Sequence, residues 1–595
     1  MASSSATAAA TAKPAQERPT VPSEPAAVTV LLDATVIDGT GGKPLPHAVV
    51  VLEKDKVKEV GPLAKVEIPD GAVTHKLTGK WIVPGLVDAH IHLFQSAGLY
   101  ARPDIVDLSR VRPYKHEAEL LGARLPETLR RYLASGVTAV VDVGSPMWSF
   151  EVREAARAEV VAPRVAVAGP LISTVSRQSL DAGDPPIVQA KSAEEARELV
   201  KKQLLRKPDL LKVWFIVPPK ADFDELLGIV QAAIAEAHRE SVRVAVHATE
   251  LDTARAAVEA GADVLVHSVD DETIDGPLIG LLKARNVIYI PTLAVYEGYS
   301  EVLGQDVRLS DIERRYGDPQ AVDSWRDFAV VPSATPEREI AERRVALEKK
   351  MPVQRKNLGK VFRSGVTIAA GTDAGNIGTL HGAALHRELE LMAEAGMSPS
   401  AVLVAATKNA AQVFSKTPSF GTIEKGKIAD LLVVDADPLT DVRHLQRIHR
   451  VVKGGIVLEP RQILPPNPAY VVQAQVDAYN SRNVDEFVSL YAPDAVVTEQ
   501  PIGKEIAAGH TAIKAVYGKL FEANSELHCE VLQRITIGST VVDHELVTGI
   551  AGRPHVRAMA RYEVADGLIR SVSVTRGPSG PEPSAAEGKS APGDE

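Results

Sequence analysis

Short apolar runs recur through the middle of the chain, and each is followed by a segment with helical periodicity. Runs that are apolar at nearly every position are typical of strands buried on both faces. Their alternation with helices predicts an α/β fold with a closed parallel (β/α)8 barrel of the TIM type over residues 81–420; an open doubly wound sheet is the alternative. The eight runs are WIVPGLVDAHIH, VTAVVDVG, RVAVAGP, LLKVWFIV, VRVAVHATE, ADVLVHSV, VIYIPTLAVY and VTIAAGTDAG.

Shorter strand patterns flank this central region on both sides. Residues 28–80 contain VTVLLDATVID and HAVVVLEKDKVKEVG, separated by a GTGG turn signal. Residues 421–461 contain IADLLVVDADP and HRVVKGGIVLEP. The first flank has too few apolar residues to fold alone. We therefore expect both flanks to form one composite β-sandwich.

The pattern changes after the linker ILPPNPAY. A predicted helix, YVVQAQVDAYNSRNVDEFVSLYA, is followed by the strand candidates CEVLQRITIG, TVVDHELVTGI, VRAMARYEVADG and LIRSVSVTR. A helix followed by an antiparallel meander indicates a separate α+β domain over residues 468–577. The two ends, residues 1–27 and 578–595, are low in complexity, and we expect them to be disordered.

Composition and charge narrow the classes of protein. The 595 residues are 45% hydrophobic and 24% charged, with a formal net charge of -10, which is typical of a globular protein and argues against a nucleic-acid partner. No apolar stretch reaches the roughly 18–20 residues of a spanning helix. The single cysteine, Cys529, cannot form an internal disulfide. We expect a cytoplasmic protein with a small-molecule partner; replacement of a natural signal peptide by the leader would give the same pattern.

Candidate metal ligands occur at the ends of several predicted barrel strands, where barrel enzymes place their sites. His90 and His92 end the first strand, and residues at i and i+2 of a strand point to the same side. His247 ends the fifth strand, His267 the sixth, and Asp373 follows the eighth. Four imidazoles and one carboxylate are therefore predicted to converge on one barrel mouth.

The fourth strand contributes a lysine, Lys212, within an apolar run. An unpaired buried ammonium is unfavourable, so the side chain either forms a salt bridge, snorkels to solvent or is modified. The functional hypothesis is carboxylation of its amine by CO2, which makes an anionic oxygen ligand that bridges two cations. Two cations about 3.5–4 Å apart activate a shared bridging water by lowering its pKa toward 7, with Asp373 as the general base and acid.

In this order and at this spacing, VPGLVDAHIHL, LLKVWF, VAVHATE, VLVHSV and GTDAG resemble the metal-dependent amidohydrolase superfamily. The resemblance extends across residues 28–461, since GTIEKGKIADLLVVDADPL is similar to the family's return into its sandwich. It implies two divalent metal ions, with zinc preferred and manganese or cobalt compatible with the ligands. Residue by residue, it implies His90, His92 and Asp373 as ligands of the first metal, His247 and His267 as ligands of the second, and carboxylated Lys212 as the bridge.

The resemblance is strongest to a branch of amide hydrolases that includes prolidase-like Xaa-Pro dipeptidases, N-acyl amino acid amidases and imidazolonepropionase-like proteins. It implies hydrolysis of an N-acyl amino acid, a dipeptide or a similar C–N bond, with a cyclic amide as the alternative substrate. Tyr296 and His381 are candidate substrate-binding residues. Packing is the alternative role for each, and a tyrosine at a barrel rim has it more often. Residues 301–363 form a charged insertion placed as a lid, whose arginines either bind a substrate carboxylate or lie on a solvated helix face.

The C-terminal domain resembles the SnoaL-like, nuclear-transport-factor-2-like cone. Relatives of that cone include isomerases as well as dimerisation and ligand-binding modules, so a second activity is the rival hypothesis. His528, Asp543 and His544 are its candidate residues, and cross-strand pairing is the structural interpretation of all three. We expect a homo-oligomer that assembles through this domain.

Overall fold

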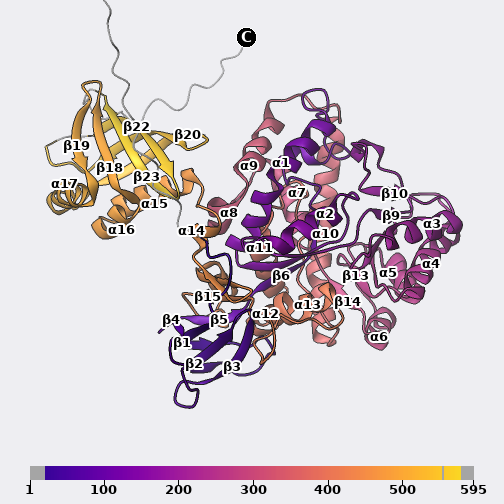
Figure 1. The fold of residues 1–595 in the computed structure, drawn as a ribbon. Coiled ribbons are helices and arrows are strands. Elements are labelled where there is room, and N and C mark those ends of the chain that lie inside the picture. The colour runs from indigo at the N-terminus through magenta and orange to yellow at the C-terminus, as the bar shows by residue number, and fades with distance from the viewer. Residues whose placement is uncertain (1–20, 553–554, 578–595) are drawn as a thin grey trace, which may run out of the picture.

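The computed structural model describes residues 21–552 and 555–577, which form a barrel, a β-sheet beside it and a C-terminal domain (Figure 1). The predicted disordered ends fall mainly on residues 1–20 and 578–595, which lie outside the described residues. Within the described ranges, no helix is long and apolar enough to cross a membrane.

The barrel strands are short and parallel, and they hydrogen-bond in sequence order. Side chains on alternate positions separate into two cores: Ala139 and Val141 face the barrel interior, whereas Val140 packs against the surrounding helices. Both faces of the sheet are thus buried, as the apolar runs predict. The strands are β6 (Leu86–Ile91), β7 (Val137–Asp142), β8 (Arg164–Val167), β9 (Leu171–Ser173), β11 (Leu211–Trp214), β12 (Val244–His247), β13 (Val264–Val266) and β14 (Ile288–Ile290).

Residues 367–374 close the ring between β14 and β6. The Tyr289 amide donates to the Thr367 carbonyl at 2.9 Å, and the Ala89 amide donates to the Ala370 carbonyl at 3.0 Å. On the other side of the ring, β8 and β9 act as one interrupted strand, since β8 pairs with β7 and β9 pairs with β11. An additional strand that the sequence patterns missed, β10 (Ile187–Gln189), pairs with β9 outside the ring. The predicted (β/α)8 barrel is confirmed.

Helices surround the barrel and cover its outer face (Figure 1). Their apolar sides pack against the outward-facing strand residues, as Val230 and Ile234 do in the shared core. The helices are α1 (Tyr114–Ala134), α2 (Ser149–Ala158), α3 (Ala193–Leu204), α4 (Phe223–Arg239), α5 (Leu251–Ala260), α6 (Gly276–Ala284), α11 (Ala384–Glu394), α12 (Pro399–Val404) and α13 (Ala410–Phe414).

The charged insertion after β14 is almost entirely helical. Its longest helix, α10, carries Ile340, Leu358 and Val361 as buried apolar residues, although most of its first half is polar. The four helices between β14 and the eighth barrel segment are α7 (Ala294–Gly304), α8 (Asp311–Tyr316), α9 (Pro319–Trp325) and α10 (Glu337–Arg363).

The two flanks of the barrel form one hydrogen-bonded sheet of eight strands. The first apolar run is divided at Gly85: Trp81–Pro84 pairs with the late flank, and the barrel strand begins at Leu86. Gly85 is required there because a Cβ atom would lie 2.2 Å from Thr138 Oγ1. The strands are β1 (Val28–Val36), β2 (Leu45–Glu53), β3 (Lys56–Pro62), β4 (Val73–Lys76), β5 (Trp81–Pro84), β15 (Leu431–Val434), β16 (Ile448–Lys453) and β17 (Ile456–Leu458).

A short helix, α14 (Pro460–Ile463), leads from this sheet to the C-terminal domain. A curved sheet with the strand order β19-β18-β23-β22-β21-β20 packs against three helices around its own apolar core. The elements are α15 (Pro468–Asn480), α16 (Val484–Ser489), β18 (Tyr491–Gln500), β19 (Lys504–Ala508), α17 (Gly509–Ala523), β20 (His528–Ile537), β21 (Thr540–Thr548), β22 (Val556–Ala565) and β23 (Leu568–Arg576).

Candidate metal centre

The carboxyl ends of the barrel strands bring the predicted ligands to one place. Leu211 and Val213 pack outward, so alternation turns Lys212 and Trp214 toward the barrel interior. The parallel register places Trp214 beside His247, the last residue of β12. His267 directly follows β13. Strand register, rather than any local sequence contact, therefore assembles the site.

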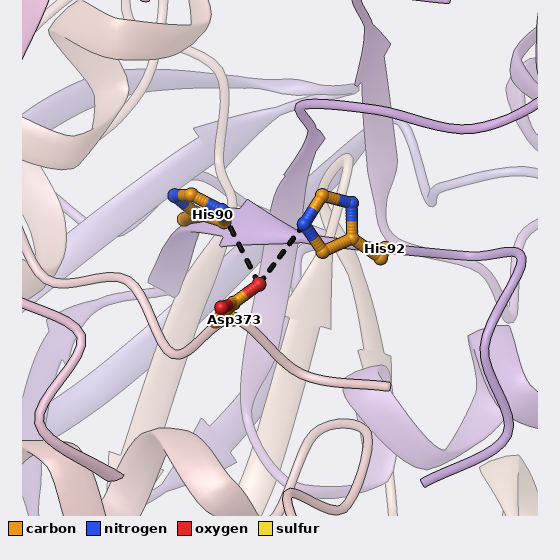
Figure 2. Close-up of side chains that lie close together, drawn as sticks. All are labelled: His90, His92 and Asp373. Atoms are coloured by element: carbon orange, nitrogen blue, oxygen red, sulfur yellow. Dashed lines mark ion pairs between the residues drawn. The ribbon is translucent and has the colours of Figure 1, made fainter. Parts of the chain in front are cut away.

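His90, His92 and Asp373 form the tightest group of potential metal ligands (Figure 2). Asp373 Oδ1 lies 2.9 Å from His92 Nε2 and 3.4 Å from His90 Nε2. One donor atom from each residue falls within a 4.8 Å span. All three residues are buried, so the group matches the size and composition of a site for one divalent cation.

The imidazole rings of His267 and His247 lie next to this group. The His90 and His267 ring centroids are 5.0 Å apart, and those of His267 and His247 are 4.4 Å apart. Lys212 is completely buried, and its Nζ has no hydrogen-bond partner among the described residues. His92, Lys212, His247, His267 and Asp373 all line one cavity of about 220 Å³.

Hydrogen bonds from neighbouring elements orient two of the rings. His92 Nδ1 lies 2.7 Å from the Gly144 carbonyl oxygen, and His267 Nδ1 lies 2.6 Å from Thr292 Oγ1. An N–H donor at Nδ1 leaves Nε2 as the lone-pair nitrogen, and such outer hydrogen bonds are typical of metal-binding histidines. The Gly144 carbonyl can only accept, so the His92 ring turns its unprotonated nitrogen to the site, whereas the Thr292 hydroxyl can pair with either tautomer of His267.

Burial sets the charge of the site residues. Burial, followed by the charge of Lys212, lowers the pKa of His90 to about 3. Burial likewise lowers the pKa of Lys212 to about 7, against the opposing charge of Asp373. Burial alone would raise the pKa of Asp373, but the His90 and His92 rings outweigh it and hold that pKa well below its usual value. Neutral imidazoles and an ionised carboxylate are the donor forms that bind divalent cations.

Unsatisfied polar atoms show that these residues fit a metal ion. Both ring nitrogens of His90 and the Lys212 amine are buried without a hydrogen-bond partner in the described part of the chain. Such atoms are costly in a folded protein unless a ligand satisfies them. Backbone strain also supports a metal site. His267 has φ 71° and Asp373 has φ 62°, values that residues with a side chain seldom adopt.

The two predicted substrate-binding residues have different positions. Tyr296 lines the cavity, but its hydroxyl donates to Asp270 Oδ2 at 2.5 Å. His381 lies outside the residues that line this cavity, and its ring nitrogens lie 2.7 Å from the Gln95 carbonyl oxygen and 2.7 Å from the Tyr132 hydroxyl. The geometry of His381 therefore supports a packing role, and only Tyr296 reaches the site.

The cavity also contains polar residues that the sequence motifs did not predict. Arg102, Tyr299, Asn376 and Arg343 line it together with the ligand residues. Of these four residues, Asn376 was the easiest to predict, because it lies three residues after Asp373 in the same loop. Arg343 belongs to the charged insertion, where its side chain could not be distinguished from the exposed arginines around it.

The candidate residues of the C-terminal domain are placed on its sheet. Both oxygens of Asp543 accept hydrogen bonds from Arg534 across the strands, at 2.7 and 2.6 Å. His528 is exposed opposite Thr548, and His544 lies opposite Gln533. These positions match the cross-strand interpretation. A buried carboxylate that the sequence analysis missed, Glu545, accepts a 2.8 Å hydrogen bond from the Tyr562 hydroxyl, and burial raises its pKa to about 7.

Known protein families match both the barrel region and the C-terminal domain. The amidohydrolase family matches residues 81–458, and a SnoaL-like domain matches residues 472–572. Comparison with curated proteins found no matching relative.

Solved structures resemble the barrel and its sheet. A putative prolidase from Bifidobacterium longum is 25% identical, with a TM-score of 0.57, and the match covers 72% of this chain and 94% of that one. The ochratoxinase of A. niger is 24% identical, with a TM-score of 0.56 and coverage of 73% and 95%. Molinate hydrolase is 21% identical, with a TM-score of 0.54 and the same coverage of 73% and 95%. The latter two likenesses concern the fold alone. The chain belongs to the amidohydrolase family, whose members hydrolyse carbon–nitrogen bonds, and it carries a SnoaL-like domain after its barrel.

Proposed function

We propose that this amidohydrolase is a two-metal enzyme that cleaves the amide bond of an N-acyl amino acid, a dipeptide or a similar small molecule. The observation that carries the proposal is the group of donor atoms at the barrel mouth, several of which are buried without a hydrogen-bond partner in the described part of the protein. Salt bridges or packing would have satisfied them in a barrel without a metal.

The ligands divide into two sets. His90, His92 and Asp373 would hold one cation, because their donor atoms already converge. His247 and His267 would hold the other, since their rings are adjacent and face the same cavity. Imidazole and carboxylate ligands favour zinc, and manganese or cobalt are compatible with them.

Lys212 lies at the base of the same cavity, with an amine that has no partner in the described ranges. Carboxylation by CO2 would form a nitrogen–carbon bond, release one proton and turn the amine into an anionic ligand with two oxygens. That change would supply the negative charge that four neutral imidazoles lack. It would also remove the energetic penalty of an unpaired buried amine.

In the bound state, the cations would supply a water of lowered pKa and polarise the scissile carbonyl. Asp373 would accept the proton that the water loses on attack and would donate it to the departing nitrogen. The carbonyl carbon gains the water oxygen, and the C–N bond breaks. His90 and His92 hold the pKa of Asp373 low, so the carboxylate is ionised at neutral pH.

The dimensions of the cavity and the known relatives support a small amide substrate. A volume of about 220 Å³ is enough for a compact molecule and too small for a folded chain. The similar structure at 25% identity is a putative prolidase.

Replacement of the proposed proton carrier tests this function. We expect Asp373→Asn to lower kcat for an N-acyl amino acid by about 100- to 10,000-fold, the range of general acid–base catalysis. Asp252→Asn, on the exposed side of α5, is the matched control and should keep wild-type kcat. Full activity in the Asp373 variant would disprove the mechanism.

A further inference from the structure

Helix α10 presents one face to the cavity. Arg343, Leu347 and Lys350 follow at i, i+4 and i+7, and therefore lie on the same side of the helix. Arg343 and Leu347 line the cavity, and Lys350 Nζ lies 3.0 Å from Asp270 Oδ1, whose carboxylate is completely buried after β13. This ion pair fastens α10 to the barrel and holds Arg343 at the cavity wall.

A second arginine of the cavity, Arg102, binds mainly to other residues of the protein. It donates two hydrogen bonds of 2.7 Å to Asp104 and others to Tyr299 and Asn376. Its charge is neutralised by Asp104, and four of its five N–H donors are occupied. Arg102 therefore shapes the cavity but has little capacity left for a ligand.

Arg177 shares the same carboxylate and stacks on the cavity wall. Its Nε lies 3.6 Å from Asp104, and its guanidinium lies 5.0 Å from the ring of Trp214. Burial lowers the pKa of Arg177, and the positive charges of Arg102 and Arg343 add to this effect against the opposing charge of Asp104. The guanidinium groups of Arg102 and Arg177 thus share the Asp104 carboxylate, and Arg343 lies near Arg177.

Of the two arginines that line the cavity, Arg102 and Arg343, the latter has more unused hydrogen-bonding capacity. Its Nε is buried without a hydrogen-bond partner within the described chain. Among the residues that the structure describes, its one ion pair is with the exposed Glu339, at 3.2 Å on the same helix. The cavity lining also has apolar side chains, among them Phe94, Leu171 and Trp214. The cavity therefore combines an unsatisfied cation with an apolar surface, which suits a molecule that carries both an anionic and an apolar group.

We infer that Arg343 is a specificity-determining residue that binds a carboxylate of the substrate and so selects N-acyl amino acids over neutral amides. A planar guanidinium matches a carboxylate with two parallel hydrogen bonds. The inference rests on the proposed function and names the residue that recognises the acidic end of its substrate.

The test compares an N-acyl amino acid with the same compound bearing a carboxamide in place of the carboxylate. We expect the wild-type enzyme to prefer the acid. Arg343→Met should lower kcat/KM for the acid roughly 10- to 100-fold, the effect of losing a hydrogen bond to a charged group, and chiefly by raising KM. Its kcat/KM for the carboxamide should stay near the wild-type value. Arg343→Lys, which keeps the charge, should recover part of the preference.

Arg338→Met is the matched control, since Arg338 lies on the same helix with 89% of its side chain exposed. It should leave both substrates unaffected. Equal losses for the acid and the carboxamide in Arg343→Met, or an unchanged preference, would overturn the inference while the proposed function stands. A wild-type enzyme that hydrolyses neither compound would overturn the proposed function itself.

Discussion

Strain, burial and unpaired polar atoms coincide at a few residues of the barrel mouth. His267 and Asp373 adopt left-handed backbone conformations, and His90 and Lys212 have buried nitrogen atoms without partners in the described chain. Each feature lowers the stability of the folded protein, and a bound cation would offset that cost by direct coordination. The ligand-free protein is therefore expected to be less stable than the loaded enzyme.

Lys212→Met separates a ligand role from a packing role. In the metal-free protein, removal of a buried unpaired amine should leave the melting temperature unchanged or raise it. In the presence of metal, the variant should lose most of the stabilisation that the wild type gains, because the bridging ligand is absent. Differential scanning calorimetry with and without zinc measures both effects.

Lys202→Met, an exposed position of α3, is the control and should behave as the wild type in both conditions. A Lys212→Met protein that is strongly destabilised without metal, yet keeps the full metal-dependent rise, would show that the lysine is structural.

At the scale of elements, the insertion after β14 determines which polar groups enter the cavity. Helix α7 contributes Tyr296 and Tyr299, and α10 contributes Arg343. Both helices are fixed at close range: α7 touches the loop after the eighth strand at Gly298, opposite Gly378. The position of these helices therefore controls the substrate-binding wall without altering the metal ligands.

Gly298→Ala tests that contact. A Cβ atom at Gly298 would lie 2.7 Å from the Gly378 carbonyl oxygen, so α7 must shift, and we expect a lower melting temperature and a higher KM. Gly280→Ala in α6 is the matched control, because its Cβ would meet no atom within 4 Å, and it should be neutral or stabilising by about 0.5–1 kcal/mol. An unchanged KM in Gly298→Ala would mean that α7 does not position the cavity wall.

The sequence was most informative where a side chain's role depends on strand periodicity. His90, His92, His247, His267 and Asp373 all lie at strand ends, and the register of the barrel brings them close together. Contacts between residues that are far apart in the sequence could not be predicted. The exposed half of α10 has the same charged pattern as its cavity-facing residues. Nothing in the sequence indicated that the hydroxyl of Tyr296, after β14, donates a hydrogen bond to the buried Asp270, after β13.

The prediction of strand boundaries was limited for a similar reason. A continuous apolar run contains both β5 and β6, although the two strands belong to different sheets. The division at Gly85 follows from the close approach of Thr138, which lies in another strand.

At the scale of the whole molecule, the C-terminal domain is attached to the barrel through a limited set of polar contacts. Asn467 hydrogen-bonds to the carbonyl oxygens of Arg314, Arg315 and Gly317 beside α8. The domain has an apolar core of its own, separate from that of the barrel. It also exposes the apolar residues Ile537 at 76%, Ile535 and Met559, which association with a second chain would cover.

Deletion of residues 466–595 should therefore leave the amide hydrolase active and abolish oligomers. The deletion keeps Ile463, which is buried in the barrel core, and all the candidate metal ligands. Sedimentation velocity of the full-length and shortened chains, with hydrolysis measured on the same samples, checks both outcomes. A monomeric full-length protein would refute the oligomer proposal, and loss of an isomerase activity would favour the rival role for this domain.

The most direct test of the two-metal amide hydrolase is the metal content of the purified wild-type enzyme, measured by mass spectrometry alongside its hydrolysis of N-acyl amino acids. We expect two equivalents per chain, loss of activity on chelation and recovery on readdition of zinc. An enzyme that hydrolyses these amides at full rate with less than one metal equivalent per chain would contradict the assignment of the barrel mouth as its metal centre.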